Sequence, residues 1–266
     1  MTLLIDFLCR FGWGLSLALV LTPAALVPSG FFRVNLLVVL GLSTFAALLA
    51  RTAIAGQFWL LPAVAAIAAW MGSIVWLAER KRAGVIFCLA CAFLLAAATV
   101  LLPAGSPEAM AAAGKPPDAS LLTGFGPAAT RLLSGLVVGL TVHAMLLGHW
   151  YLNAPGMRVD ALRRLIDWAV GAWGAQVALA AAAAIMAGGL VVGHGSGAGS
   201  GAGVDSATVA LVSLRWLAGL VGLPILLWMS RKTLDIPNTQ SATGILYVAC
   251  IAAIVGELTA QLLQAA

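Results

Sequence analysis

Charged residues are scarce in this chain, because Asp, Glu, Lys and Arg together make up only 9% of its 266 residues. Hydrophobic residues account for 62%, and the mean hydropathy is +1.07. Soluble globular domains carry about 25% charged residues and far less apolar surface. The composition therefore predicts an all-α, polytopic integral membrane protein that lies in the lipid bilayer.

Catalytic and nucleotide-binding signatures are also missing, since no Walker loop, HExxH or GxSxG sequence occurs. No segment forms a soluble domain on which a nucleotide could bind, which excludes a free-standing enzyme of the soluble type. The net charge of +5 comes from a few short loop clusters. Such clusters indicate membrane orientation and contact with anionic lipid, so we expect no nucleic-acid partner.

Cysteine is rare, and all four cysteines fall in apolar segments. Cys88 and Cys91 form a CxxC sequence, but it lies in the middle of a predicted helix. A thioredoxin-like motif needs a strand-to-helix turn and an exposed thiolate. We therefore interpret these cysteines as small packing residues.

Eight apolar runs are long enough to cross a hydrocarbon core about 30 Å thick. The first is not followed by a cleavage site and a soluble domain, so we expect it to remain as a helix. A polar, Pro-rich loop at 104–126 separates a first four-helix half, 1–103, from a second, 127–266. The expected spans are 7–27, 31–49, 58–78, 84–102, 127–152, 165–192, 207–229 and 241–263.

Lys and Arg residues are unequally divided between the two sides of this bundle. One side has chiefly Arg51, Lys115 and Arg131. Because cytoplasmic loops retain positive charge, we expect both termini on the non-cytoplasmic side of a cell inner membrane. The loops after the first, third, fifth and seventh spans carry Arg33, Arg80, Lys81, Arg82, Arg158, Arg163, Arg164, Arg231 and Lys232.

Glu257 is a carboxylate in an otherwise apolar span, where a charged group is expected to have an ion-pair partner or a functional role. With this orientation Glu257 lies in the outer half of the membrane, at a depth similar to Arg10, Arg131 and Arg215. We expect Glu257 to pair with Arg215. Such a pair either locks two helices together or forms a polar site for an anionic ligand, in which Glu257 handles a proton and Arg131 and Arg215 bind the ligand.

Two histidines lie in the fifth span, His143 inside the hydrocarbon and His149 near its inner edge. Six residues turn a helix by about 240°, so the two cannot hold one metal ion together. His149 precedes Trp150 and Tyr151, which is typical of a membrane interface, and it is also a candidate for cofactor binding. His143 could form a helix-packing hydrogen bond, contact a quinone, or bind the iron of a b-type haem, and only in that last case would it be a metal ligand.

The eighth span opens with polar residues that are typical of a helix N-terminus. Two further candidates for a cofactor-binding cavity on the inner side, shared with His143, are Gln240 and Tyr247. In the fifth span, residues 135–139 read GLVVG, a spacing that lets another helix approach closely.

Three functions fit these features. The first is a membrane subunit of a respiratory or electron-transfer complex that contacts a quinone, a quinol or haem and binds other subunits through its short loops. The second is a small solute transporter in which Arg215 and Glu257 recognise the solute, although no internal repeat or broken helix is evident in the sequence. The third is a ligand-free structural or assembly subunit, in which every buried charge serves helix packing.

Overall fold

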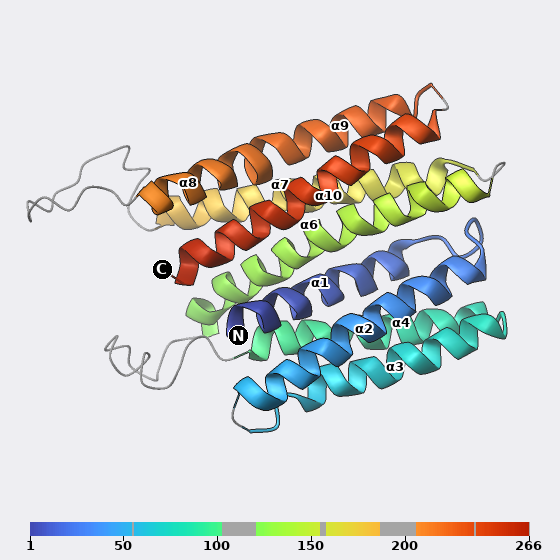
Figure 1. The fold of residues 1–266 in the computed structure, drawn as a ribbon, viewed down its shortest axis with the longest axis horizontal. Coiled ribbons are helices and arrows are strands. Elements are labelled where there is room, and N and C mark those ends of the chain that lie inside the picture. Colours follow the sequence, from blue (N-terminus) through green and yellow to red (C-terminus); the bar gives the residue numbers. More distant parts are fainter. Residues whose placement is uncertain (55, 103–120, 155–157, 187–205, 237, 266) are drawn as a thin grey trace, which may run out of the picture.

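The computed structural model describes residues 1–54, 56–102, 121–154, 158–186, 206–236 and 238–265, which form helices and no strand in these ranges. The helices are long and nearly antiparallel (Figure 1). They are α1 (Thr2–Leu21), α2 (Ser29–Ala53), α3 (Leu60–Leu77), α4 (Lys81–Leu101), α6 (Leu121–Asn153), α7 (Asp160–Met186), α8 (Ser206–Leu214), η1 (Arg215–Gly222), α9 (Leu223–Thr233) and α10 (Thr239–Ala265).

Eight membrane spans are long and apolar enough to cross a bilayer, as the sequence predicts, because α8, η1 and α9 run on as one span from Ser206 to Thr233. The chain is a multi-pass membrane protein. Two spans differ from expectation. Helix α6 begins at Leu121 and contains Pro127 within it, whereas the sequence placed the helix start at Pro127. The seventh span contains eight residues of π-helix, Arg215–Gly222.

Helices α1 to α4 form one side of the bundle and α6 to α10 the other (Figure 1). Helix α1 lies at the junction, because it packs against both α4 and α6. The GLVVG segment makes the predicted close approach, since a Cβ atom on Gly139 would overlap the backbone of Gly14. The division into two halves of four spans remains a prediction, and most of the loop predicted between them lies outside the described residues.

Lipid-facing side chains cover the outside of the bundle. Trp70, Phe93 and Ile86 keep 54%, 73% and 63% of their surface exposed. Exposed apolar surface on this scale suits hydrocarbon better than water. Inside, the rings of Phe32 and Trp76 stack with centroids 4.1 Å apart. The helices are therefore apolar on both faces, as expected for a bundle inside a bilayer.

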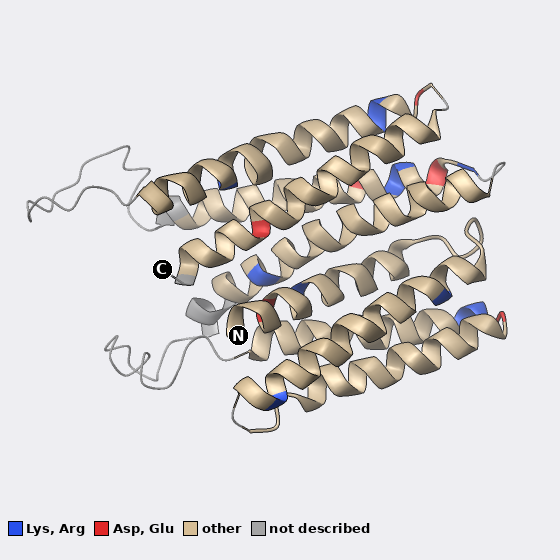
Figure 2. Cartoon of the chain, in the orientation of Figure 1, with Lys and Arg blue, Asp and Glu red and all other residues tan. Residues whose placement is uncertain are grey.

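Both termini lie at one end of the bundle, and most Lys and Arg residues gather at the opposite end (Figure 2). This arrangement fits the positive-inside rule with the termini outside the cytoplasm. The end of the bundle that carries the termini is called the terminal end below. That it faces away from the cytoplasm stays a prediction.

Candidate functional site

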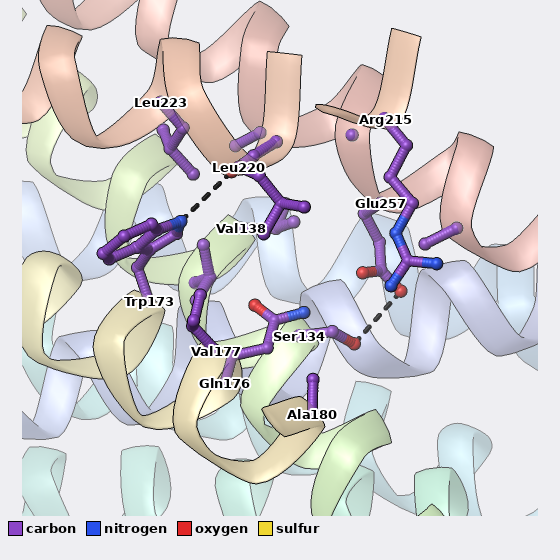
Figure 3. A pocket seen from close by; sticks show the side chains of 15 residues that line it. Ser134, Val138, Trp173, Gln176, Val177, Ala180, Arg215, Leu220, Leu223 and Glu257 are labelled. Atoms are coloured by element: carbon purple, nitrogen blue, oxygen red, sulfur yellow. Dashed lines mark hydrogen bonds between the residues drawn. The ribbon is translucent and has the colours of Figure 1, made fainter. Parts of the chain in front are cut away.

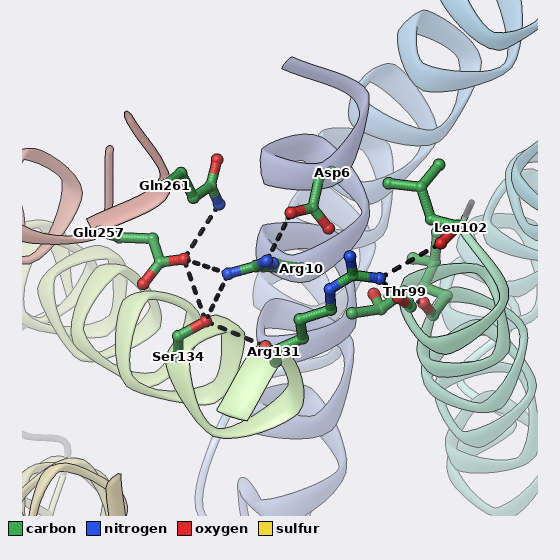
Figure 4. A network of polar contacts seen from close by, with 9 residues as sticks. Asp6, Arg10, Thr99, Leu102, Arg131, Ser134, Glu257 and Gln261 are labelled. Carbon is green, nitrogen blue, oxygen red and sulfur yellow. Dashed lines mark hydrogen bonds and ion pairs between the residues drawn. The ribbon is translucent and has the colours of Figure 1, made fainter. Parts of the chain in front are cut away.

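A buried ionic cluster joins α1 to α10 near the terminal end (Figure 4). Arg10 Nη1 lies 2.7 Å from Glu257 Oε1, and Arg10 Nη2 lies 2.5 Å from Asp6 Oδ2. The three side chains expose only 4%, 5% and 9% of their surface. Arg10 is eight residues from the start of α1 and Glu257 eight from the end of α10, so each lies about 12 Å inside the bundle. The cluster therefore lies in the hydrocarbon, where charges are costly.

Neutral polar groups complete the contacts of Glu257. Ser134 Oγ donates a hydrogen bond to Glu257 Oε1 at 3.0 Å, and Gln261 Nε2 donates to the same oxygen at 2.9 Å. With Arg10, three donors therefore meet at Oε1. Glu257 Oε2 has no hydrogen-bond partner among the described residues, and it points away from Arg10 (Figure 4). One carboxyl oxygen is fixed and the other is free for a ligand.

Helix spacing and glycine contacts explain how these groups meet. Asp6 and Arg10 are four residues apart, as are Glu257 and Gln261, so each pair shares one helix face. Helices α1 and α6 touch at their backbones, because a Cβ atom on Gly135 would overlap the backbone of Arg10. This close approach places Ser134 within 3.2 Å of Arg10 Nη1. The glycine of α6 thus positions the serine that precedes it.

The predicted pair of Glu257 with Arg215 is wrong, because Arg10 is the ion-pair partner of Glu257. Depth along the helices placed all three groups at one level, but depth does not say which helices touch. Helix α6 packs between α1 and α10, and Arg10 of α1 reaches the carboxylate at the place where α1 and α10 come together beside α6. Arg215 forms no ion pair with a described residue.

Arg131 serves a different purpose from the one predicted. Its Nη1 donates hydrogen bonds to the carbonyl oxygens of Leu102, at 3.2 Å, and Thr99, at 3.4 Å. These carbonyls belong to the end of α4, where the last helical carbonyls lack partners within the helix. Arg131 therefore caps α4, and the positive charge also suits the negative end of the helix dipole.

A polar cavity of about 70 Å³ lies on the other side of Glu257, between α6, α7, η1 and α10 (Figure 3). Ser134, Gln176, Arg215 and Glu257 supply its polar groups. The other lining residues are apolar or glycine apart from Trp173, whose Nε1 donates to the carbonyl oxygen of Gly219 at 3.1 Å. A volume of this size holds on the order of five water molecules. The cavity thus combines an arginine, an amide and a carboxylate in apolar walls.

A second cavity of about 420 Å³ lies one to two helical turns closer to the terminal end. It is lined by residues of the same three helices, α6, α7 and α10, including Thr130, Arg131, Ala183 and Gln264. Each of these four residues lies three or four positions from a residue that lines the first cavity in the same helix. Those residues are Ser134 in α6, Ala180 in α7 and Ala260 in α10. The two cavities therefore lie one after the other along these helices, from Glu257 towards the terminal end.

His143 lies in a helix-packing contact. Its Nε2 lies 2.8 Å from the hydroxyl of Thr22, its ring centroid lies 5.1 Å from that of Phe31, and the side chain is fully buried. Neither cavity described above includes His143. Among the described residues, no three His, Cys, Asp or Glu side chains group together as a site for a bare metal ion. The packing supports the helix-packing interpretation, and haem ligation by His143 stays a prediction.

Three further predicted site residues lie at the other end of the bundle. His149 Nδ1 lies 3.1 Å from the hydroxyl of Tyr247, and both side chains are exposed on the surface. Gln240 is also exposed, two turns before Tyr247 in α10. The predicted inner cavity shared with His143 is not formed by these residues, since Tyr247 contacts His149 instead. This aromatic and polar surface fits a membrane interface.

Four residues of the site went unrecognised in the sequence: Asp6, Ser134, Gln176 and Gln261. The spacing of Asp6 to Arg10 and of Glu257 to Gln261 carried a usable signal, because polar residues four apart in an apolar helix share a face. Ser134 and Gln176 carried none, since single neutral polar residues are common in membrane spans. In the comparisons with known proteins, no family model, no curated protein and no solved structure matches this chain.

Proposed function

We propose that the protein is a membrane subunit of an electron-transfer complex that binds a quinol head group in the cavity beside Glu257. The observation that carries this proposal is the free Oε2 of a buried carboxyl group beside a cavity with apolar walls, an arginine and an amide. A quinol has an aromatic ring and two hydroxyl groups, so it needs such walls together with a donor and an acceptor. Arg215 and Gln176 provide donors, and Glu257 provides the acceptor.

The outer wall of the cavity also suits a lipid-soluble ligand. It is formed in part by η1, which has no buried residue. Trp216 and Leu217 of this segment are 58% and 68% exposed and face the surrounding lipid. A ligand with a hydrocarbon tail can leave that tail in the bilayer while its head group occupies the cavity. No entry from water is then required.

Glu257 is placed to take a proton from a bound quinol hydroxyl. Oxidation of a quinol releases two protons and two electrons. In this proposal one proton passes to Glu257 Oε2, and the electrons pass to the redox centre of a partner subunit. The second proton leaves towards the terminal end, on the side where the second cavity lies. Positioned proton acceptors of this kind typically contribute 10²–10⁴-fold to a rate.

Binding of a short-tailed benzoquinol to the purified protein tests the proposal. We expect Arg215→Gln to weaken binding about 10-fold to 100-fold, because a hydrogen bond from a charged donor contributes roughly 1.5–3 kcal/mol. Arg51→Gln is the matched control, since Arg51 is an exposed arginine at the terminal end that contacts only the Trp59 ring in the described structure. Equal loss in both variants, or no binding to the wild type, would sink the proposal.

A solute transporter is the second candidate, and the π-helical segment Arg215–Gly222 favours it. π-helical turns often mark functional sites, and interrupted helices line the binding sites of many transporters. Arg215 begins the segment and faces the cavity. Uptake of a solute into proteoliposomes, abolished by Arg215→Ala while quinol binding is absent, would decide for the transporter.

A further inference from the structure

The ionic cluster contains two carboxyl groups and one guanidinium. Arg10 uses separate nitrogens for them, Nη1 for Glu257 and Nη2 for Asp6. If both carboxyls were ionised, the cluster would carry one uncompensated negative charge inside the hydrocarbon. Burial of such a charge is strongly unfavourable, and a buried group takes up a proton instead.

No neighbouring cation other than Arg10 forms an ion pair with either carboxyl among the described residues. Arg131 of α6 binds the carbonyls at the end of α4, and Arg215 of η1 faces the cavity without an ion pair to a described residue. From α2, Arg51 is exposed and lies over the Trp59 ring at 5.6 Å. Among the described residues, α4 contributes only backbone carbonyls near the cluster, and α7 contributes the neutral Gln176. Within α1, the other titratable neighbour is the buried thiol of Cys9.

Two buried atoms without hydrogen-bond partners also indicate that the cluster is not fully ionised. Asp6 Oδ1 and Gln261 Oε1 are buried without a hydrogen-bond partner, and their side chains belong to residues that are 7% and 2% exposed. A fully ionised cluster would leave the Asp6 oxygen as a bare anionic atom in a place without a donor. Addition of one proton removes the surplus charge while Arg10 keeps an ionised partner.

We propose that Asp6 and Glu257 share one proton across Arg10, so that one carboxyl is protonated whenever the other is ionised. A proton that enters Glu257 from the cavity then makes Asp6 release its own, and Arg10 changes its ionised partner from Glu257 to Asp6. One proton enters and one leaves, so the charge of the cluster is unchanged. No electron is transferred in this step.

The direction of release follows from where Asp6 lies. Asp6 is four residues from the start of α1, about 6 Å along the helix from the terminal end. Glu257 opens to the cavity and Asp6 lies on the other side of Arg10, nearer the membrane surface. The pair therefore moves a proton from the cavity to the terminal end. This route rests on the proposed function for its proton donor, but the sharing of a proton does not.

Infrared spectroscopy of the purified protein tests the sharing without any ligand. The wild type has one buried protonated carboxyl, seen as a carbonyl band that shifts in deuterated water. Both Asp6→Asn and Glu257→Gln remove this band, because the remaining carboxyl becomes the ionised partner of Arg10. Asp167→Asn, at an exposed aspartate paired with Arg231, leaves it unchanged. Independent carboxyls predict the opposite, that only one of the two substitutions removes the band, and that result overturns the proposal.

A second measurement uses the wild type alone, in case a variant does not fold. A hydrophobic carbodiimide reacts with protonated carboxyl groups in membranes, and mass spectrometry locates the adduct. Sharing predicts one adduct per chain, on Asp6 or on Glu257 and never on both. Two adducts in one chain, or none at either residue, overturn it. If the band and the adducts behave as expected but quinol does not bind, the proposed function fails and the shared proton remains.

Discussion

Gly14 of α1 and Gly135 of α6 meet backbone to backbone, and a Cβ atom added to Gly14 would overlap the carbonyl oxygen of Gly135. This contact lies one turn from Arg10 in α1 and directly beside Ser134 in α6, so it sets the distance across which the ionic cluster forms. It also joins the first four spans to the rest of the bundle. The site therefore depends on glycine at both positions, Gly14 and Gly135, where a side chain would overlap the backbone of the other helix.

Gly14→Ala should destabilise the protein by about 3 kcal/mol or more, because the backbone of α6 cannot move aside as a side chain can. Gly41→Ala is the control, since no atom lies within 4 Å of a Cβ atom added there. The melting temperature of the detergent-solubilised protein measures both. Similar melting temperatures for the two variants would contradict the close packing of α1 on α6.

Arg10→Leu should cost more stability than Glu257→Leu. Loss of Arg10 leaves two buried carboxyl groups without their cation, whereas loss of Glu257 leaves Arg10 paired with Asp6. Removal of one member of a buried pair typically costs about 3–5 kcal/mol, and we expect Arg10→Leu in this range. The free energy of unfolding in mixed detergent tests the order. The reverse order would show that Arg10 is not the centre of the cluster.

Thr22 and His143 should be coupled by about 0.5–1.5 kcal/mol, the usual contribution of a hydrogen bond. A double-mutant cycle with Thr22→Val and His143→Phe measures this coupling as the departure from additivity. We also expect that the purified wild type shows no haem absorbance that depends on His143. A haem spectrum lost in the His143→Phe variant would restore His143 as an iron ligand.

Arg131→Met should destabilise the protein by about 1–2 kcal/mol, because two carbonyls at the end of α4 lose a charged donor. Arg51→Met removes only an exposed contact with the Trp59 ring and should cost less, at most about 1 kcal/mol. Thermal unfolding of the two variants, side by side, makes the comparison. Quinol binding should survive in both, since neither arginine lines the cavity beside Glu257.

The sequence was sufficient for the fold class and the eight spans, because a length of apolar residues is a local property. It also identified Glu257 and Arg10 as buried charges at one depth. It could not identify their contact, which depends on how α1 and α10 pack on the two sides of α6. Asp6 was overlooked because it lies near a helix start, where a charge is ordinary. Only the fold shows that it shares the guanidinium of Arg10 with Glu257.

The cavity could not be predicted from the sequence either. Its lining comes from helices that are far apart in the chain, and the π-helical turn that places Arg215 depends on how η1 packs against α10. Gly219 and Gly256 meet there, with 2.7 Å between a Cβ atom added to Gly256 and the Cα atom of Gly219. Glycine pairs of this kind are frequent in membrane spans, so they gave no specific signal.

Photoaffinity labelling with an azidoquinone tests the central claim most directly, because it reports where a quinone binds without a change to the protein. The account predicts a label on peptides that contain Gln176 or the η1 segment, reduced by Arg215→Gln and by excess unlabelled quinol. A label confined to the surface around His149 and Tyr247, or one that is unaffected by excess quinol, would contradict it.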